Sequence, residues 1–422
     1  MRKTPPTRKP GAFGIADDGS LDRREFVRTA SRLGASLGLS MGGLAPLIAA
    51  AQTRDPLKLG WIRPSTGRLA SSFAPLYVGG LIALEEINAA CGIMGRPIVR
   101  VEEDDEASPA KQPAVAKKVM DANPFAIFGP VGTSQAMASV AMTSPNKVIH
   151  TTSANGVDMG DGVKYPYHYQ VSYNSQTQAE VIVRHLAENL KLKKIGIIQE
   201  NTAFGEQGTA GSLPLLEKYG LKPVGVEVYP LTAPDLSPYV SNLRKAGAEG
   251  LIAWISTIPS ASMAFNAMHR QQWYPHIAGH AGLFLESIFD LVPPEAVAKV
   301  YATYYKNFTW TAAEGIGERQ LAYAKKIANY PEARGNEVIV AGQPYYDFLY
   351  LLKTVIESEK SFDSDRIKRV LDNLKGYKGM TGTLTFTPTN HTGISAQDVV
   401  LASLVSAKDP KAQRMFRERY SA

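Results

Sequence analysis

The fold class is indicated by one stretch of the chain, Phe125-Ala126-Ile127-Phe128-Gly129-Pro130-Val131-Gly132-Thr133-Ser134. Its apolar start predicts a buried strand, and the glycines lead into an Ala- and Met-rich segment that is typical of a helix. A helix that begins in this way leaves its first backbone amides, and the positive end of its dipole, facing outward. We expect an anion-binding site there, with Thr133 or Ser134 capping the helix or donating a hydroxyl to a carboxylate.

Strand-like and helix-like segments alternate on both sides of this stretch, which predicts an α/β fold with doubly wound parallel sheets. One series has predicted strands at 57–62, 98–101, 125–128 and 147–150, with helices around 81–87 and at 113–122. A second series has helices at 178–190, 205–219, 236–246 and 260–272, with strands at 194–199, 223–229, 250–255 and 276–279. The chain therefore predicts two similar lobes.

A second polar loop follows the strand predicted at 147–150. It consists of Thr151-Thr152-Ser153-Ala154-Asn155-Gly156. Ligands bind doubly wound sheets at the carboxyl ends of their strands, where this loop and the start of the helix at Thr133 both lie. We therefore expect the two segments to form one binding site.

The N-terminal region predicts export. Arg23 and Arg24 precede an apolar stretch that glycines interrupt, the layout of a twin-arginine signal peptide. We expect residues 1–51 to be removed near Gln52, which makes the mature protein soluble and periplasmic. The single cysteine, Cys91, excludes an intramolecular disulfide and lies too far downstream to carry a lipid.

The charge of the chain does not indicate nucleic-acid binding. The formal net charge is +7, but residues 1–51 hold eight Lys/Arg and four Asp/Glu, so the rest of the chain carries +3. These charges are scattered and form no basic stripe interleaved with aromatic residues. We expect no nucleic-acid partner.

Motifs for catalysis are weak in this sequence. The Gly34–Gly38 match to a nucleophile elbow lies in the predicted export signal, and Ser108–Lys111 contains a proline and begins a helix. His276 and His280 have a spacing suited to a metal, but Pro275 and Gly279 indicate a strand end. We expect no enzyme activity, no metal and no cofactor.

The chain resembles the periplasmic solute-binding proteins of branched-chain amino acid (Leu/Ile/Val) ABC transporters, which have the type I periplasmic binding fold. The resemblance covers nearly the whole chain after the signal. It is carried by the segments at 62–67, 85–96, 103–109, 127–130, 201–206 and 235–239.

This resemblance implies two Rossmann-like lobes joined by three hinge crossings. Lobe 1 would comprise 55–169 and 302–380, and lobe 2 would comprise 170–301 and 381–422. The crossings would lie near His168–Val171, Val300–Tyr304 and Thr381–Thr385.

The resemblance also implies the site. Thr133 matches the serine that holds a ligand carboxylate, and the loop at 153–155 matches the segment that completes this contact. Phe204 matches an aromatic residue that closes over the ligand. The ligand-binding residues expected are Ser72, Thr133, Ser134, Thr152, Ser153, Ala154, Asn155, Phe204, Ser256, Thr257, His280 and Ala281.

Three of these positions depart from the family pattern. Ser72 and Ser256 or Thr257 stand where aromatic residues are usual. Ala281 stands where amino-acid binders carry a glutamate that pairs with the ligand's ammonium, and an unpaired buried ammonium costs several kcal/mol. We therefore expect a carboxylate ligand that lacks an α-amino group, such as an aromatic or keto acid.

The predicted function is capture of a small organic acid or amino acid by lobe closure, for delivery to the permease and ATPase subunits of an ABC importer. Two alternatives stay open from the sequence. One is an amide or urea binder, because the hydroxyls and amides at 151–155 suit neutral groups equally well. The other is a receptor module that senses its ligand without transport.

The export prediction can be tested by replacing Arg23 and Arg24 with lysine. Twin-arginine machinery reads the arginine pair, so we expect the precursor to accumulate in the cytoplasm with its fold intact. Fractionation and immunoblotting measure this. A normal periplasmic yield of the double variant would refute the twin-arginine assignment.

Overall fold

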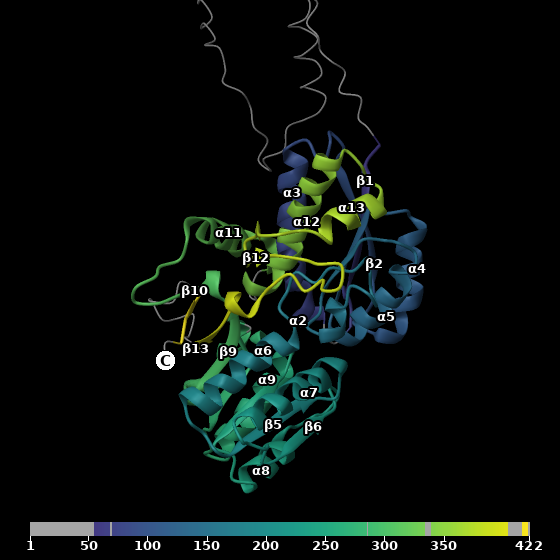
Figure 1. Ribbon diagram of the computed structural model, residues 1–422. Coiled ribbons are helices and arrows are strands. Elements are labelled where there is room, and N and C mark those ends of the chain that lie inside the picture. Colours follow the sequence, from purple (N-terminus) through teal and green to yellow (C-terminus); the bar gives the residue numbers. More distant parts are fainter. Residues whose placement is uncertain (1–54, 68–69, 285, 334–338, 404–415, 421–422) are drawn as a thin grey trace, which may run out of the picture. The chain divides into compact units, whose positions relative to one another are not determined.

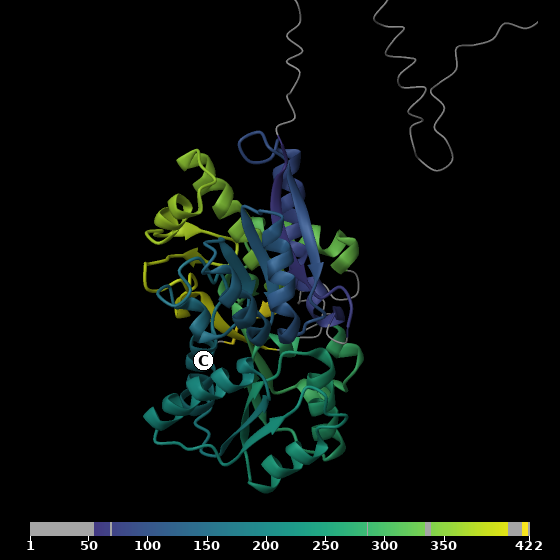
Figure 2. The same ribbon diagram turned by 90° about the vertical axis from the view of Figure 1, so that its right-hand side faces the viewer.

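The computed structural model describes residues 55–67, 70–284, 286–333, 339–403 and 416–420. The predicted export signal, residues 1–51, lies outside the described residues. The described chain forms two mainly parallel sheets with helices packed on them (Figures 1 and 2). The predicted doubly wound α/β class is confirmed. In the described part of the chain, no helix has the length and apolar character needed to cross a membrane.

The first sheet has the strand order β2-β1-β3-β4, and all its neighbouring strands are parallel. Its strands are β1 (Leu57–Arg63), β2 (Ile98–Asp104), β3 (Ala126–Val131) and β4 (His150–Ser153). The helical segments from this part of the chain are α2 (Ala70–Phe73), η1 (Ala74–Tyr77), α3 (Val78–Ala89), η2 (Pro109–Lys111), α4 (Gln112–Asp121), α5 (Thr133–Thr143) and η3 (Val157–Gly160).

Side chains of β1 alternate between two helix layers, as the period of a strand requires. Trp61 packs against Tyr345 of α12 (Ile339–Glu359), with 6.1 Å between ring centroids. Its neighbour Ile62 is buried in a separate cluster with Val119 of α4 and Ile127 of β3. Both faces of this sheet are therefore covered, which fits the apolar sequence and complete burial of its central strand β3.

The second sheet has the order β13-β9-β8-β7-β5-β6, and only the β13–β9 pair is antiparallel. Its strands are β5 (Ile195–Glu200), β6 (Val226–Tyr229), β7 (Gly250–Trp254), β8 (His276–Gly279), β9 (Val300–Tyr305) and β13 (Val399–Ser403). Its helical segments are α6 (Ser175–Arg184), the π-helix η4 (His185–Asn189), α7 (Ala203–Lys218), α8 (Ser237–Lys245), α9 (Ile258–Arg270), η5 (Ala281–Phe284), η6 (Glu286–Asp290) and α10 (Pro294–Val297).

The remaining elements follow β9. They are η7 (Lys306–Phe308), β10 (Thr309–Trp310), α11 (Glu318–Asn329), η8 (Pro331–Ala333), α12, α13 (Ser364–Leu371), β11 (Tyr377–Lys378), β12 (Thr383–Leu384), η9 (Ala396–Asp398) and β14 (Arg417–Glu418). Helix α12 packs on α3, beside the first sheet (Figure 1).

Two of the three predicted crossings need correction. The segment Val300–Tyr304 is not a crossing, because β9 pairs with β8 and β13 up to Tyr305. Residues 302–305 thus belong to the second sheet and not to lobe 1. Thr381 is still held by Asp347 of α12, and the chain joins the second sheet only at β13. The other lobe boundaries stay predictions.

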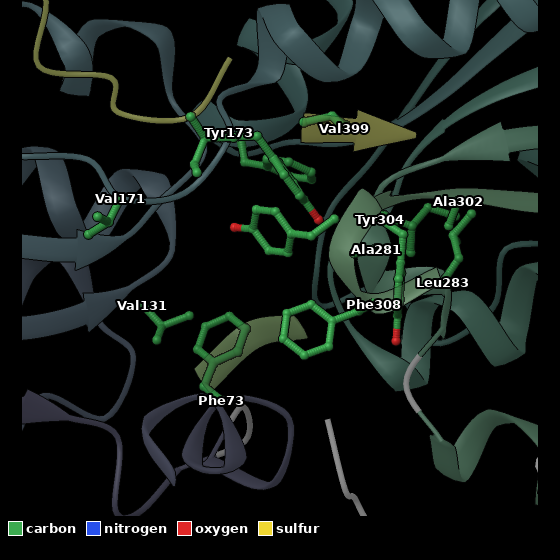
Figure 3. Packing of buried hydrophobic residues seen from close by; sticks show 14 of the residues in the cluster. Phe73, Val131, Val171, Tyr173, Ala281, Leu283, Ala302, Tyr304, Phe308 and Val399 are labelled. Atoms are coloured by element: carbon green, nitrogen blue, oxygen red, sulfur yellow. The ribbon is translucent and has the colours of Figure 1, made fainter. Parts of the chain in front are cut away.

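The predicted crossing at His168–Val171 lies beside a later segment of the chain. His168 forms a bridge with His150 of β4, and Gln170 forms one with Thr392. The structure therefore places segments more than 200 residues apart in sequence side by side at this point. One contiguous cluster of buried apolar residues includes residues of both sheets, and Figure 3 shows part of it, with Val131 of β3 and Ala302 of β9.

Three buried histidines connect β4 with these two segments. His150 bonds to Thr143 Oγ1 at 2.7 Å and to the Gly129 carbonyl, while His168 bonds to Thr152 Oγ1 at 3.0 Å and to the Met159 carbonyl at 2.8 Å. His391 contacts the His168 carbonyl at 2.7 Å. Burial lowers the pKa of His150 to about 4 and that of His168 to about 3. Both imidazoles are therefore neutral in the folded protein at neutral pH.

We expect this neutrality to make the fold sensitive to acid. The unfolded chain binds protons at these histidines below about pH 6.5, whereas the folded chain does not until about pH 4 or lower, so stability falls as pH drops through this window. Each histidine contributes a slope of about 1.4 kcal/mol per pH unit. Denaturant titrations of His168→Gln and wild type should show a shallower slope in the variant.

The matched control is His269→Gln, at a half-buried histidine on α9 that hydrogen-bonds Tyr274. It controls for the replacement of a histidine by glutamine outside this buried cluster. If His168→Gln retained the full wild-type slope between pH 6.5 and 4.5, the buried histidines would not be its source.

Candidate functional site

A cavity lies at the carboxyl ends of strands from both sheets. Its volume is about 910 Å³, including its opening to solvent. Its walls hold both polar groups and aromatic rings. The described lining residues are Ser72, Phe73, Leu76, Val131, Gly132, Thr133, Ser134, Gln135, Ser153, Asn155, Ser172, Tyr173, Glu200, Thr202, Phe204, Leu231, Ser256, His280, Ala281, Gly282, Tyr305 and Pro344.

The first polar end is the start of α5. Gly132 precedes this helix with φ of 95°, a left-handed conformation that favours glycine, and it turns the chain from β3 into the helix. The first N–H groups of α5 consequently have no partner within the helix. Thr133 is buried, and within the described residues its Oγ1 has no hydrogen-bond partner. An unpaired hydroxyl beside free amides suits an anionic group of a ligand.

The loop after β4 completes this end. Ser153 and Asn155 line the cavity. The Ala154 carbonyl accepts hydrogen bonds from Gln170 and Ser172, so the first crossing segment holds the loop in place. Ser72, across the cavity, is also buried, and its Oγ has no partner among the described residues.

Thr152 and Ala154 do not line the cavity, in contrast to the prediction. The strand expected at 147–150 is β4 at His150–Ser153, so Thr152 belongs to a paired strand and not to a loop. Its hydroxyl contacts His168, and Ala154 is buried in a separate apolar cluster. Thr152 and Ala154 therefore face the protein interior beside the loop and not the cavity.

The second sheet supplies the opposite wall. Phe204, at the start of α7, packs edge-on against His280 with 4.8 Å between ring centroids. Ala281 and Ser256 line the cavity. Thr257 does not, because its hydroxyl caps α9 by accepting from the Ser260 amide at 3.4 Å.

His280 is a neutral lining group. Its Nδ1 lies 2.7 Å from Gln178 Oε1, which also accepts from the Thr303 hydroxyl. Burial lowers the pKa of His280 to about 3. With Nδ1 donating to Gln178, the other ring nitrogen is an acceptor.

Sequence reasoning missed Glu200, the last residue of β5. It lines the cavity at 3% exposure and accepts hydrogen bonds from Thr202 Oγ1 (2.7 Å), Ser256 N (3.0 Å) and Ser256 Oγ (2.8 Å). Burial raises the pKa of its carboxyl above the ordinary range. A glutamate at the end of an apolar strand could have been noted as a site candidate, because parallel strands present their ligand-binding groups there.

Aromatic rings form the middle of the cavity. Tyr173 and Tyr305 contact each other with 4.6 Å between ring centroids. Figure 3 shows Phe73, Val131, Tyr173 and Ala281, four lining residues that come from different elements. Among the residues that the structure describes, no group of three His, Cys, Asp or Glu side chains could hold a metal ion. The arrangement suits recognition of a small molecule with a polar end and an apolar body.

The comparisons with known proteins agree with this geometry. The family model described as "Periplasmic binding protein" matches residues 56–409. The Leu/Ile/Val-binding protein homolog 8 of Brucella suis is 24% identical over 315 residues, which cover 71% of this chain and 76% of that protein. Homolog 7 of the same organism is 23% identical over 358 residues, covering 82% and 87%.

Two solved structures share the fold. The branched-chain amino acid transporter substrate-binding protein of Streptococcus pneumoniae, in complex with isoleucine, has a TM-score of 0.73 at 20% identity and covers 87% of this chain and 100% of its own. An ABC transporter solute-binding protein of Rhodopseudomonas palustris, in complex with 4-hydroxybenzoate, has a TM-score of 0.72 at 17% identity and covers 87% and 97%. This chain belongs to the periplasmic binding protein family of the Leu/Ile/Val-binding type and has its type I fold.

Proposed function

We propose that this protein captures a small carboxylate-bearing molecule in the periplasm and delivers it to an ABC importer. The observation that carries the proposal is the start of α5, where the buried, unpaired Thr133 hydroxyl stands beside free helix amides. Family members of similar structure bind isoleucine and 4-hydroxybenzoate, and both of these ligands carry a carboxylate. The family consists of binding proteins, which supports a receptor and not an enzyme.

Delivery to an importer and export through the twin-arginine pathway belong to the same proposal. The ABC transporter context is taken from the structural relatives. The export route is taken from Arg23 and Arg24, which lie outside the described residues.

The proposal predicts that Thr133→Val weakens carboxylate binding. The change keeps the shape of the side chain but removes a donor to a charged acceptor, a loss of about 1.5–3 kcal/mol, or roughly ten-fold or more in affinity. Calorimetry of wild type against a library of small carboxylates identifies a ligand, and the same ligand is then titrated into the variant.

The matched control is Thr209→Val on α7. Thr209 is also buried, its Oγ1 has no hydrogen-bond partner within the described residues, and it does not line the cavity. Its affinity should equal that of the wild type. Equal affinities of Thr133→Val and wild type would remove Thr133 from the site.

Closure of the lobes is the second testable part. The starts of α5 and α7 are in contact, because the Ala203 amide donates to Ser134 Oγ at 3.2 Å. A second contact joins η3 to α7, where the Val157 amide donates to Gln207 Oε1 at 2.7 Å. Gln207 does not line the cavity. If binding and closure are coupled, Gln207→Ala should weaken affinity by about 2- to 12-fold, the value of one hydrogen bond, without any lost ligand contact.

Small-angle scattering measures closure directly. The radius of gyration of the wild type should fall at saturating ligand. The absence of compaction, together with unchanged affinity of Gln207→Ala, would show that binding does not require closure.

A further inference from the structure

Glu200 stands out among the polar groups of the cavity because it is an acid without a Lys or Arg partner among the described residues. Its three hydrogen-bond donors are Thr202 Oγ1, Ser256 N and Ser256 Oγ, all of which are neutral. None of the ion pairs between described residues includes Glu200. Among the described lining residues there is no Lys or Arg, and the one histidine, His280, is neutral.

A buried carboxylate in this situation costs free energy. Burial of an ion is compensated only by pairing or by full hydrogen bonding, and neutral donors replace water incompletely. The raised pKa of the Glu200 carboxyl is the expected sign of this cost. The start of α7, where Thr202 is the N-cap, supplies only a partial positive charge. The missing full charge can come from a ligand.

The two ends of the cavity thus differ in sign. The start of α5, in the first sheet's part of the chain, offers unpaired donors to an anion. Glu200, in the second sheet, offers a carboxylate, and the aromatic rings of Tyr173 and Phe204, which can attract a cation, line the same cavity. A ligand that carries only a carboxylate would satisfy one end and leave Glu200 without a counter-ion.

We propose that Glu200 is the counter-ion for a positively charged nitrogen of the ligand. Glu200 thereby selects zwitterionic amino-carboxylates over carboxylates of the same shape that lack the amine. The inference rests on the proposed function, because it assumes a ligand whose carboxylate is held at Thr133 and assigns Glu200 to the nitrogen of that ligand. It differs from the expectation drawn from Ala281. The acid that position 281 lacks is supplied by the end of another strand, β5.

The test compares matched pairs of ligands on the full mature protein by calorimetry. The pairs are isoleucine and 3-methylpentanoate, phenylalanine and 3-phenylpropanoate, and 4-aminobutyrate and butyrate. In the pair that fits the cavity, wild type should bind the amine-bearing member about 10- to 100-fold more tightly, the value of a hydrogen bond to a charged group. Wild-type preferences require no variant, so they are decisive even if a Glu200 variant is unstable.

The variant Glu200→Gln should lose this preference while it still binds the amine-free member. Its matched control is Glu206→Gln, which removes one negative charge from the first turn of α7, the helix that follows Glu200, at an exposed position outside the cavity. The control should retain the wild-type preference, and thermal unfolding of both variants checks that they are folded.

Each outcome has one meaning. A wild-type preference for the amine-free member, or an equal loss of both ligands in Glu200→Gln, would overturn the role of Glu200 and leave carboxylate capture intact. Failure of wild type to bind any carboxylate in the panel would overturn the proposed function and this inference together.

Discussion

The conformation of Gly129 and Gly132 is the constraint on which the site depends. Strand β3 is buried along its whole length and pairs with β1 and β4, so its path is fixed by the sheet. Gly129 has φ of 86°, and a Cβ there would lie 1.9 Å from the Ile62 carbonyl oxygen. Only glycine permits this close approach. The strand can therefore run directly into α5 and present the start of the helix at the edge of the sheet.

Most of the fold was predictable because its elements carry local patterns. The β3–α5 stretch, the alternating segments and β8 at His276–Gly279 were all expected from periodicity and glycine placement. The strand expected at 147–150 was shifted, since the apolar pair Val148-Ile149 suggested a strand that in fact begins at His150. Pairing with β3 recruits His150, Thr151 and Ser153 into β4, and this pairing is a tertiary effect that no local pattern reveals.

The site was predictable only in part, for a related reason. Thr133, Ser153, Asn155 and Phe204 follow strands or start helices, so their location at the sheet edge follows from topology. The burial of Glu200 depends on Ser256, which lies 56 residues away in sequence, and no spacing rule brings them together. Likewise, the family resemblance placed the second crossing at β9, and the β-branched and aromatic run there gives no sign of whether it crosses between sheets or stays within one.

In the proposed roles of Thr133 and Glu200, the cavity selects ligands through buried polar groups that the protein itself does not fully satisfy. Within the described residues, the Thr133 hydroxyl is buried and unpaired, and the buried Glu200 carboxylate has neutral donors alone. Each group costs stability in the empty protein, and that cost is recovered only by a ligand that brings the complementary group to it. Selectivity then arises less from strong contacts with the right ligand than from the penalty that a wrong ligand leaves in place. A cavity whose polar lining groups were all hydrogen-bonded or ion-paired within the protein would bind a wider range of molecules. A ligand without the complementary groups would then leave no buried polar group without a partner.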